Sequence, residues 1–279
     1  MIDVAMTDLR TDGRIDVPVI AAEAFDVLDT GRQIAPFSSQ LPDFSLDDAY
    51  RVTAAVWKLR EARGEIAIGR KIGFTNRTTW PDYASMWGYV YDHTVHDLAD
   101  LGGRFSLAGL AEPRIEPEIV FRLAAAPMPG MDERALLGCI DEVAHGFEIV
   151  QSIYPGWAFT APDAVAAFGL HGALLLGPWH SATANEEEWK QALSTFTVDL
   201  LRNGEVVGQG HAANVLGGPL TALRHLVDLL ARDLINPPLT AGEIVTTGTL
   251  TRVPPVAPGE MWSTTLTDVA LEGIRVQFT

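Results

Sequence analysis

Residues 115–123 read IEPEIVFRL, and the interpretation of the whole chain starts from them. Apolar or neutral residues occupy every second position, which predicts a strand with one face in a core. Glu116 and Glu118 then point together from the other face, because side chains two apart share a side of a strand. Such close carboxylates repel each other unless a positive charge lies between them, and their oxygens suit Mg²⁺, Mn²⁺ or Ca²⁺. The alternative is a solvent-exposed edge strand, where Glu is ordinary and Pro117 is tolerated.

A third carboxylate occurs about thirty residues later. Residues 146–152 read GFEIVQS and predict another strand, with Glu148 among apolar neighbours. A lone buried Glu is costly unless it is paired or bound to a metal. Glu148 would therefore complete a set with Glu116 and Glu118, leaving other positions around a cation for water and substrate.

A lysine stands inside another apolar stretch, residues 66–76, which read IAIGRKIGFTN and predict a strand. Lys71 is either an edge charge or a buried amine, and burial would lower its pKa and suit it to acid/base chemistry. The aromatic stretch 77–97 predicts a loop with a short strand, of the kind that covers a site. Asp92, His93 and His96 are candidate site residues within that loop.

The composition limits the class of protein. The chain has 279 residues, and 36 Asp and Glu against 20 Lys and Arg give a net charge of −16. This charge argues against nucleic acid and anionic membranes as partners. The single cysteine, Cys139, is expected in the core, excludes an internal disulfide and favours a cytoplasmic location. We expect no signal peptide and no membrane span, because no apolar run is long enough.

The remaining patterns predict an α+β protein. A small helical N-terminal lobe (1–64) would contain helices at 16–32 and 45–62, the second with a Ser45–Asp48 capping box. A β-rich catalytic domain (65–279) would follow. Its predicted elements are a helix at 131–145, a short helix near Asp163, a strand at 172–178, a hairpin at 195–212 with a type I′ turn at Asn203-Gly204, a helix at 218–233, and strands at 243–251 and 261–278.

Taken together, these motifs resemble the fumarylacetoacetate hydrolase superfamily, in its 2-keto-4-pentenoate hydratase and 4-oxalocrotonate decarboxylase branch. The resemblance covers roughly residues 45–265. The matching stretches are RKIGFTN (70–76), RIEPEIVFRL (114–123), HGFEIVQS (145–152), HGALLLG (171–177), LGGPLTALRHL (216–226) and LTAGEIVTTGTLT (239–251). The E-x-E strand followed by the F-E-I-V strand is a fairly specific pair.

The resemblance implies a mixed β-roll fold with a small helical lobe, and it implies roles for ten residues. The metal ligands for Mg²⁺ or Mn²⁺ would be Glu116, Glu118 and Glu148. The catalytic residues would be Lys71, Asp92 and Asp163, with Lys71 handling protons. The substrate-binding residues would be Arg70, His171, Gly248 and Thr249. The family also tends to form homo-oligomers.

The implied activity is that of a hydratase, a lyase of aromatic-type catabolism. It would add water to a small-molecule 2-hydroxy-2,4-dienoate or 2-oxo-enoate and release a 4-hydroxy-2-oxo acid. The alternatives are a decarboxylase of a 2-oxo-hexenedioate, a C–C hydrolase of acylpyruvates, or a non-catalytic partner protein that keeps only the fold. A decarboxylase needs a second cationic pocket for the distal carboxylate, and Arg70, Arg77 and Arg114 are its candidates.

The chain departs from the branch at the expected substrate end. Asp92 or His93 would take the position of the family's acidic residue in GYVYDHTV. Gln151 follows the strand where the family often has Asp, and His171 stands where a small polar residue is usual. His145, His171 and His211 have irregular spacing, so we interpret them as site walls or core histidines rather than metal ligands.

Overall fold

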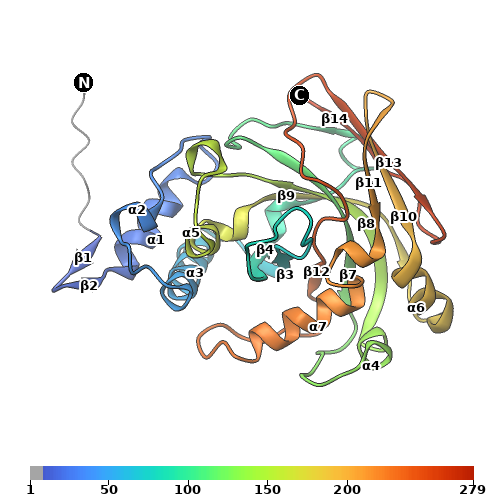
Figure 1. The fold of residues 1–279 in the computed structure, drawn as a ribbon, viewed down its shortest axis with the longest axis horizontal. Coiled ribbons are helices and arrows are strands. Elements are labelled where there is room, and N and C mark those ends of the chain that lie inside the picture. The colour runs from blue at the N-terminus through green and yellow to red at the C-terminus, as the bar shows by residue number, and fades with distance from the viewer. Residues whose placement is uncertain (1–8) are drawn as a thin grey trace.

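The computed structural model describes residues 9–279, so the first eight residues of the predicted lobe lie outside the described part. A seven-stranded mixed sheet is the largest element (Figure 1). In sheet order, its strands are β4 (Met86–Tyr91), β3 (Ala67–Gly73), β12 (Ile244–Thr246), β7 (Arg114–Leu123), β8 (Ile140–Val150), β9 (His171–Ser181) and β5 (Val95–Asp97). The long antiparallel strands β7, β8 and β9 lie side by side in this sheet.

A second sheet packs beside the first, and with the helices described below the two sheets give an α+β fold. Its strands, in order, are β11 (Glu205–His211), β10 (Thr197–Arg202), β13 (Met261–Thr267), β14 (Arg275–Phe278) and β6 (Arg104–Phe105). Phe147 of β8 shares a buried cluster with Trp262 and Phe278, which joins the two sheets. The predicted hairpin is confirmed, since Asn203 and Gly204 have φ of 53° and 86°, the positive values that a type I′ turn requires.

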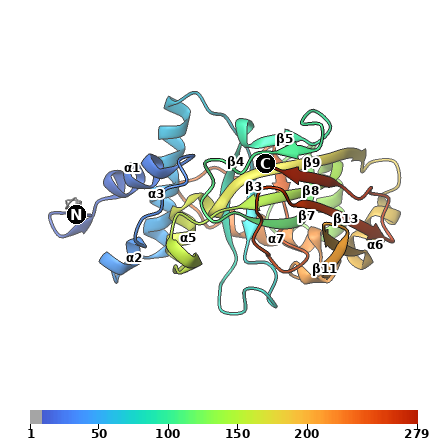
Figure 2. The ribbon, with the colours of Figure 1, turned by 90° about the horizontal axis from the view of Figure 1, so that it is seen from above.

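The helices fall into two groups. The lobe contains α1 (Val17–Val27), α2 (Phe37–Gln40), α3 (Leu46–Ala62) and α5 (Ala161–Ala166), after a small ribbon of β1 (Arg10–Thr11) and β2 (Arg14–Ile15). Figure 2 shows this group on one side of the sheets. The second group contains α4 (Glu133–Leu137), α6 (Glu186–Thr195) and α7 (Pro219–Leu230). Short 3-10 turns are η1 (Asp92–Thr94), η2 (Pro155–Trp157), η3 (Phe168–Leu170) and η4 (Ala212–Asn214).

The lobe is held together by segments far apart in the sequence. The predicted capping box is confirmed, because the Ser45 and Asp48 side chains each bond the other's backbone N–H at the start of α3. Ile20 of α1 and Val52 of α3 share one buried cluster with Val165 of α5. The predicted lobe therefore completes its core with a helix from the second half of the chain.

One predicted element is wrong. The helix expected at 131–145 ends at Leu137, and strand β8 begins at Ile140. Ten residues of β8 pair with β7 or β9, and its residues Val143 and Ala144 are fully buried. This pairing outweighs a local pattern that helix and strand can both satisfy. Cys139 is buried at the junction, as expected.

The predicted strand at 243–251 is much shorter than expected. β12 covers only Ile244–Thr246, and Gly248 then turns with a φ of 95°. The segment expected as a strand at 261–278 forms two strands, β13 and β14, that pair with each other. In the described part of the chain, no helix has the length and apolar character to cross a membrane.

Candidate metal centre and active site

Adjacent strands bring the three predicted carboxylates together. Glu116 of β7 lies directly opposite Glu148 of β8, and Glu118 follows on the same face of β7. One oxygen from each carboxylate lies within 4.8 Å of the others. The three residues are at most 6% exposed, which excludes the alternative of a solvent-exposed edge. The strand periodicity thus positions a buried acidic cluster.

The cluster has fewer hydrogen-bond donors than its oxygens can accept. Gly248 donates its N–H to Glu118 Oε2 at 2.7 Å, but Glu118 Oε1 is buried without a partner. Glu148 Oε2 makes no hydrogen bond either and has only the Lys71 Nζ ion pair at 3.3 Å. Orphaned buried carboxylate oxygens are strongly destabilising unless a cation joins them. The residues therefore fit a hard divalent cation, whose usual ligands are carboxylate oxygens.

The electrostatics of the cluster agree with this fit. Burial raises the pKa of Glu116 to about 7 and raises that of Glu118 well above its usual range. Burial acts in the same direction on Glu148, but Lys71 and His171 outweigh it and lower that pKa. In the protein alone, the cluster resists carrying three negative charges at once.

The structure reverses the direction of the pKa shift that we expected for Lys71. Burial alone would lower this pKa, as the sequence suggested, but Glu148, Glu116 and Glu118 together raise it above the usual value. Lys71 Nζ is therefore an ammonium group facing the carboxylates rather than a neutral amine. It comes from β3, which is separated from β7 by β12.

A narrow pocket opens beside the cluster and toward solvent. Lys71 and Glu116 lie at its polar end, and Gly248 and Thr249 line it as expected. Sequence reasoning missed the other lining residues, which are Gly73, Phe74, Thr75, Trp80, Met86, Val150, Trp157 and Leu170. The available signals were the motif RKIGFTN for Phe74 and Thr75, and the aromatic loop for Trp80.

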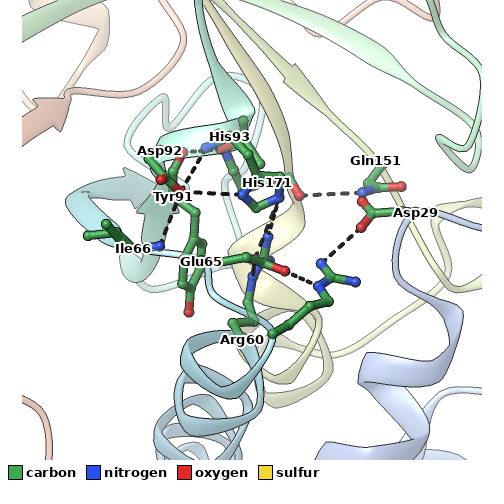
Figure 3. Close-up of polar contacts among 11 residues, drawn as sticks. Asp29, Arg60, Glu65, Ile66, Tyr91, Asp92, His93, Gln151 and His171 are labelled. Atoms are coloured by element: carbon green, nitrogen blue, oxygen red, sulfur yellow. Dashed lines mark hydrogen bonds and ion pairs between the residues drawn. The ribbon is translucent and has the colours of Figure 1, made fainter.

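His171 lies behind the metal cluster instead of in the pocket lining. Its Nδ1 is 2.8 Å from Glu148 Oε1, and its Nε2 is 2.9 Å from Thr94 Oγ1. Thr94 also donates its hydroxyl to the carbonyl of Tyr91. Figure 3 shows the His171 ring beside Tyr91 and His93. His171 therefore orients a candidate metal ligand, although we expected it to contact substrate.

Asp92 lies outside the pocket lining, on the turn η1 (Figure 3). Its side chain is 43% exposed and accepts hydrogen bonds from the backbone N–H groups of Ile66 and His93. These bonds lower the pKa of Asp92, with that from Ile66 contributing most. Asp92 therefore stabilises the turn in this structure, and its side chain does not line the pocket where we expected a catalytic residue.

Asp163 is fully buried, but in the lobe. Ser38 donates its N–H and hydroxyl to the Asp163 carboxylate at 2.9 and 2.6 Å, and Thr160 does the same at 2.8 and 2.7 Å. Asp163 thus closes a capping box at the start of α5 and joins it to α2. The structure does not bring it to Lys71 or to the carboxylate cluster.

The arginines proposed for substrate are not among the residues that line the pocket. Arg70 follows the opposite face of β3 from Lys71, with NH1 3.0 Å from Glu243 Oε2 and its guanidinium over Tyr89. Arg77 bonds the carbonyl of Tyr83. Arg114 lies on the same face of β7 as Glu116 and stacks on the ring of the lining residue Trp157, 4.3 Å from its centroid.

Comparison with known proteins agrees with the resemblance. Residues 107–273 match the family described as "Fumarylacetoacetate (FAA) hydrolase C-terminal". The 2-hydroxyhexa-2,4-dienoate hydratase of Comamonas testosteroni is 31% identical over 91% of this chain and 94% of its own. The 4-oxalocrotonate decarboxylase of Pseudomonas sp. (strain CF600) is 32% identical over 81% of this chain and 84% of its own.

A solved structure extends the similarity to the whole fold. The 4-oxalocrotonate decarboxylase from Pseudomonas putida G7, complexed with magnesium and adipate, has a TM-score of 0.84 and 27% identity. The similarity covers 94% of this chain and 97% of that one, so it includes the helical lobe. With the family match, the buried carboxylate cluster and this fold in agreement, the chain belongs to the fumarylacetoacetate hydrolase family.

Proposed function

We propose that this protein is a divalent-metal-dependent hydratase. It would add water to a 2-hydroxy-2,4-dienoate, through its 2-oxo-enoate form, and release a 4-hydroxy-2-oxo acid. The observation that carries the proposal is the pocket in which Glu116 and Lys71 lie at one end and the apolar side chains of Trp80, Met86 and Leu170 form part of the wall. The hydratase among the relatives described above supports this choice.

Glu116, Glu118 and Glu148 would hold the cation, Mg²⁺ or Mn²⁺. When bound, this ion would supply Lewis-acid stabilisation for negative charge that develops on the 2-oxo group of the substrate. The chain has a net charge of −16, which repels an anionic substrate, and the bound cation would supply the local positive charge that attracts it.

Lys71 is the group that would move protons. Ketonisation transfers the enol proton to carbon, and hydration then places hydroxide on C4 and a proton on C3. One group must therefore give and take a proton near the substrate. Among the pocket-lining residues of the described chain, Lys71 Nζ is the one cation, and Glu148 holds it in place at 3.3 Å.

The apolar wall favours a hydratase over a decarboxylase. Trp80, Met86 and Leu170 would contact the tail of the substrate, and they provide no partner for a second carboxylate. Burial of an unpaired carboxylate against such a wall costs several kcal/mol, on the order of the penalty for an unpaired buried charge. A dienoate with an uncharged tail fits this pocket better than a dienedioate.

Decarboxylation is the second candidate, and one contact favours it. Arg114 stacks on Trp157, so rotation of that indole would bring a guanidinium toward the pocket. Decarboxylases among the relatives and the solved structures also support this candidate. The experiment below separates the two reactions.

The test is an ultraviolet assay with 2-hydroxypenta-2,4-dienoate, 2-hydroxyhexa-2,4-dienoate and 2-hydroxyhexa-2,4-dienedioate. Each is run with Mg²⁺, with Mn²⁺ and with excess chelator. We expect metal-dependent loss of the dienoate absorbance, a 4-hydroxy-2-oxo acid as product and no CO₂. Release of CO₂ from the dienedioate as the faster reaction would replace the hydratase by the decarboxylase. If none of the three is consumed, acylpyruvate cleavage becomes the next activity to assay.

The expected homo-oligomer stays a prediction that sedimentation would check.

A further inference from the structure

One hydroxyl group in the pocket has no partner within the protein. In residues 9–279, the buried side-chain atoms without a hydrogen bond are Glu23 Oε2, Arg70 Nε, Thr75 Oγ1, Glu118 Oε1, Glu148 Oε2 and Thr246 Oγ1. The two glutamate oxygens belong to the metal cluster. Thr75 is 1% exposed and lines the same pocket, while Thr246 is fully buried outside it. An unpaired buried hydroxyl destabilises a protein, so its presence at the pocket requires an explanation.

The backbone around Thr75 is strained in a way that places this hydroxyl. Phe74 precedes it at the end of β3 with a φ of 57°, a left-handed conformation that is rare for a bulky side chain. Gly248 has a φ of 95°, and a Cβ at that position would lie 1.8 Å from Thr75 Oγ1. Strained conformations of this kind concentrate at functional sites. Both features are needed for Thr75 Oγ1 to lie against the Gly248 backbone at the pocket.

Gly248 also connects this hydroxyl to the metal cluster. Its N–H donates to Glu118 Oε2, so Thr75 lies at the rim of the carboxylate set. Two other polar side chains of the lining are engaged. Thr249 donates its hydroxyl to the carbonyl of Thr251, and Lys71 is paired with Glu148. In the pocket lining of the described chain, Thr75 Oγ1 is the one buried side-chain donor without a hydrogen bond.

We propose that Thr75 is a substrate-binding residue whose hydroxyl donates a hydrogen bond to the carboxylate of the 2-oxo acid. This inference rests on the proposed function, because it requires an anionic substrate at the metal end of the pocket. A hydrogen bond to a charged acceptor is stronger than one between neutral groups, so a small hydroxyl can contribute substantially to affinity. Removal of this bond should weaken binding of a 2-oxo acid by roughly 10- to 100-fold.

The experiment uses pyruvate as the probe, because it carries the 2-oxo acid end of the substrate without a reactive tail. Calorimetry measures pyruvate binding to the Mg²⁺-loaded full chain, and dienoate assays measure KM. Thr75→Val removes the hydroxyl and keeps the shape of the side chain, and Thr75→Ser keeps the hydroxyl. Thr246→Val is the matched control, since it removes a second buried, unpaired hydroxyl that does not line the pocket.

We expect Thr75→Val to weaken pyruvate binding and raise KM by roughly 10- to 100-fold, with Mg²⁺ affinity unchanged. Its melting temperature should stay level or rise, because an unpaired buried hydroxyl is removed. Thr75→Ser should stay within about threefold of the wild type, since hydrogen-bonding capacity is kept. Thr246→Val should leave pyruvate affinity unchanged and should not lower the melting temperature.

Three results would overturn the inference. They are wild-type pyruvate affinity in Thr75→Val, equal losses in Thr75→Val and Thr75→Ser, and no pyruvate binding by the Mg²⁺-loaded wild type. The proposed function is tested separately. A wild type that hydrates dienoates while Thr75→Val binds normally removes only the role of Thr75. If the wild type hydrates no dienoate while Thr75→Val loses pyruvate binding, only the proposed hydratase activity is rejected.

Discussion

Two carboxylates of this protein are equally buried and have opposite surroundings. Asp163 in the lobe and Glu118 in the sheet are both fully inaccessible to solvent. Asp163 accepts four hydrogen bonds from Ser38 and Thr160. Glu118 accepts one from Gly248, has one orphaned oxygen, and faces two other carboxylates. Burial of an acid therefore does not identify a site. An orphaned oxygen beside two other buried carboxylates distinguishes Glu118 from Asp163.

The difference separates stability from function. The lobe satisfies its buried acid completely, so that acid joins α2 to α5 and holds the fold. The sheet leaves its acids unsatisfied, so the apo protein is destabilised locally and the site can gain free energy by binding a cation. The predictions below test this contrast.

The largest effect is expected for Glu118→Gln. This change removes one charge and one ligand oxygen from the cluster and keeps the volume of the side chain. Activity should fall at least about 10³-fold in kcat/KM, because the cation loses a ligand. Dienoate assays and Mn²⁺ binding measure the loss. The same variant in chelator should melt no lower than the wild type, because burial already disfavours the charged form of Glu118 and glutamine is a neutral residue of similar size.

The Mg²⁺ response of stability is the control for that variant. For the wild type, Mg²⁺ at a hundredfold excess over its Kd should add about 2.7 kcal/mol to the free energy of unfolding. Glu118→Gln should show little of this increase. A full Mg²⁺ response in Glu118→Gln would contradict the ligand role of Glu118.

Asp163→Asn should have the opposite pattern. The amide nitrogen cannot accept the hydrogen bonds that the carboxylate accepts, so partly buried donors of Ser38 and Thr160 lose their partner. We expect the free energy of unfolding to fall by roughly 2–4 kcal/mol, measured by urea denaturation. Mn²⁺ affinity of the folded variant should equal that of the wild type. A stable but inactive Asp163→Asn would instead support the catalytic role that the resemblance implied.

A smaller effect is expected for His171→Phe, which keeps a ring behind Glu148 and removes both nitrogens. Glu148 Oε1 then loses its 2.8 Å contact, so the ligand is less well oriented. Mn²⁺ affinity should weaken by about 10- to 100-fold, as measured by electron paramagnetic resonance. His171→Gln, which retains a donor, should recover part of the loss. Equal Mn²⁺ affinity in His171→Phe and the wild type would exclude the positioning role.

The smallest effect is expected for Asp92→Asn. The side chain is partly exposed and can still accept the N–H bonds of Ile66 and His93 after the change. Stability should change by less than about 0.5 kcal/mol, and kcat/KM by less than about threefold. A loss of activity comparable to that of Glu118→Gln would mean that Asp92 reaches the substrate after all.

The contrast between the two carboxylates also shows how far the sequence could predict this molecule. The alternation in residues 115–123 places Glu116 and Glu118 on one face whatever the rest of the chain does. The second strand motif then makes Glu148 the natural third member. Whether each acid has partners depends on donors from distant segments, such as Gly248 for Glu118 and Ser38 for Asp163. Asp163 could therefore not be distinguished from a site residue by local pattern.

The sequence by itself determined the α+β class, the capping box of α3, the Asn203-Gly204 turn, and the shared face of the E-x-E carboxylates. These depend on contacts between residues close in the chain. Only the tertiary structure decided that residues 140–145 form a strand, because pairing with β7 outweighs local preference. It also decided the raised pKa of Lys71 and the free hydroxyl of Thr75. Charges and hydrogen-bond partners that arrive from distant segments control both properties, and no local pattern records them.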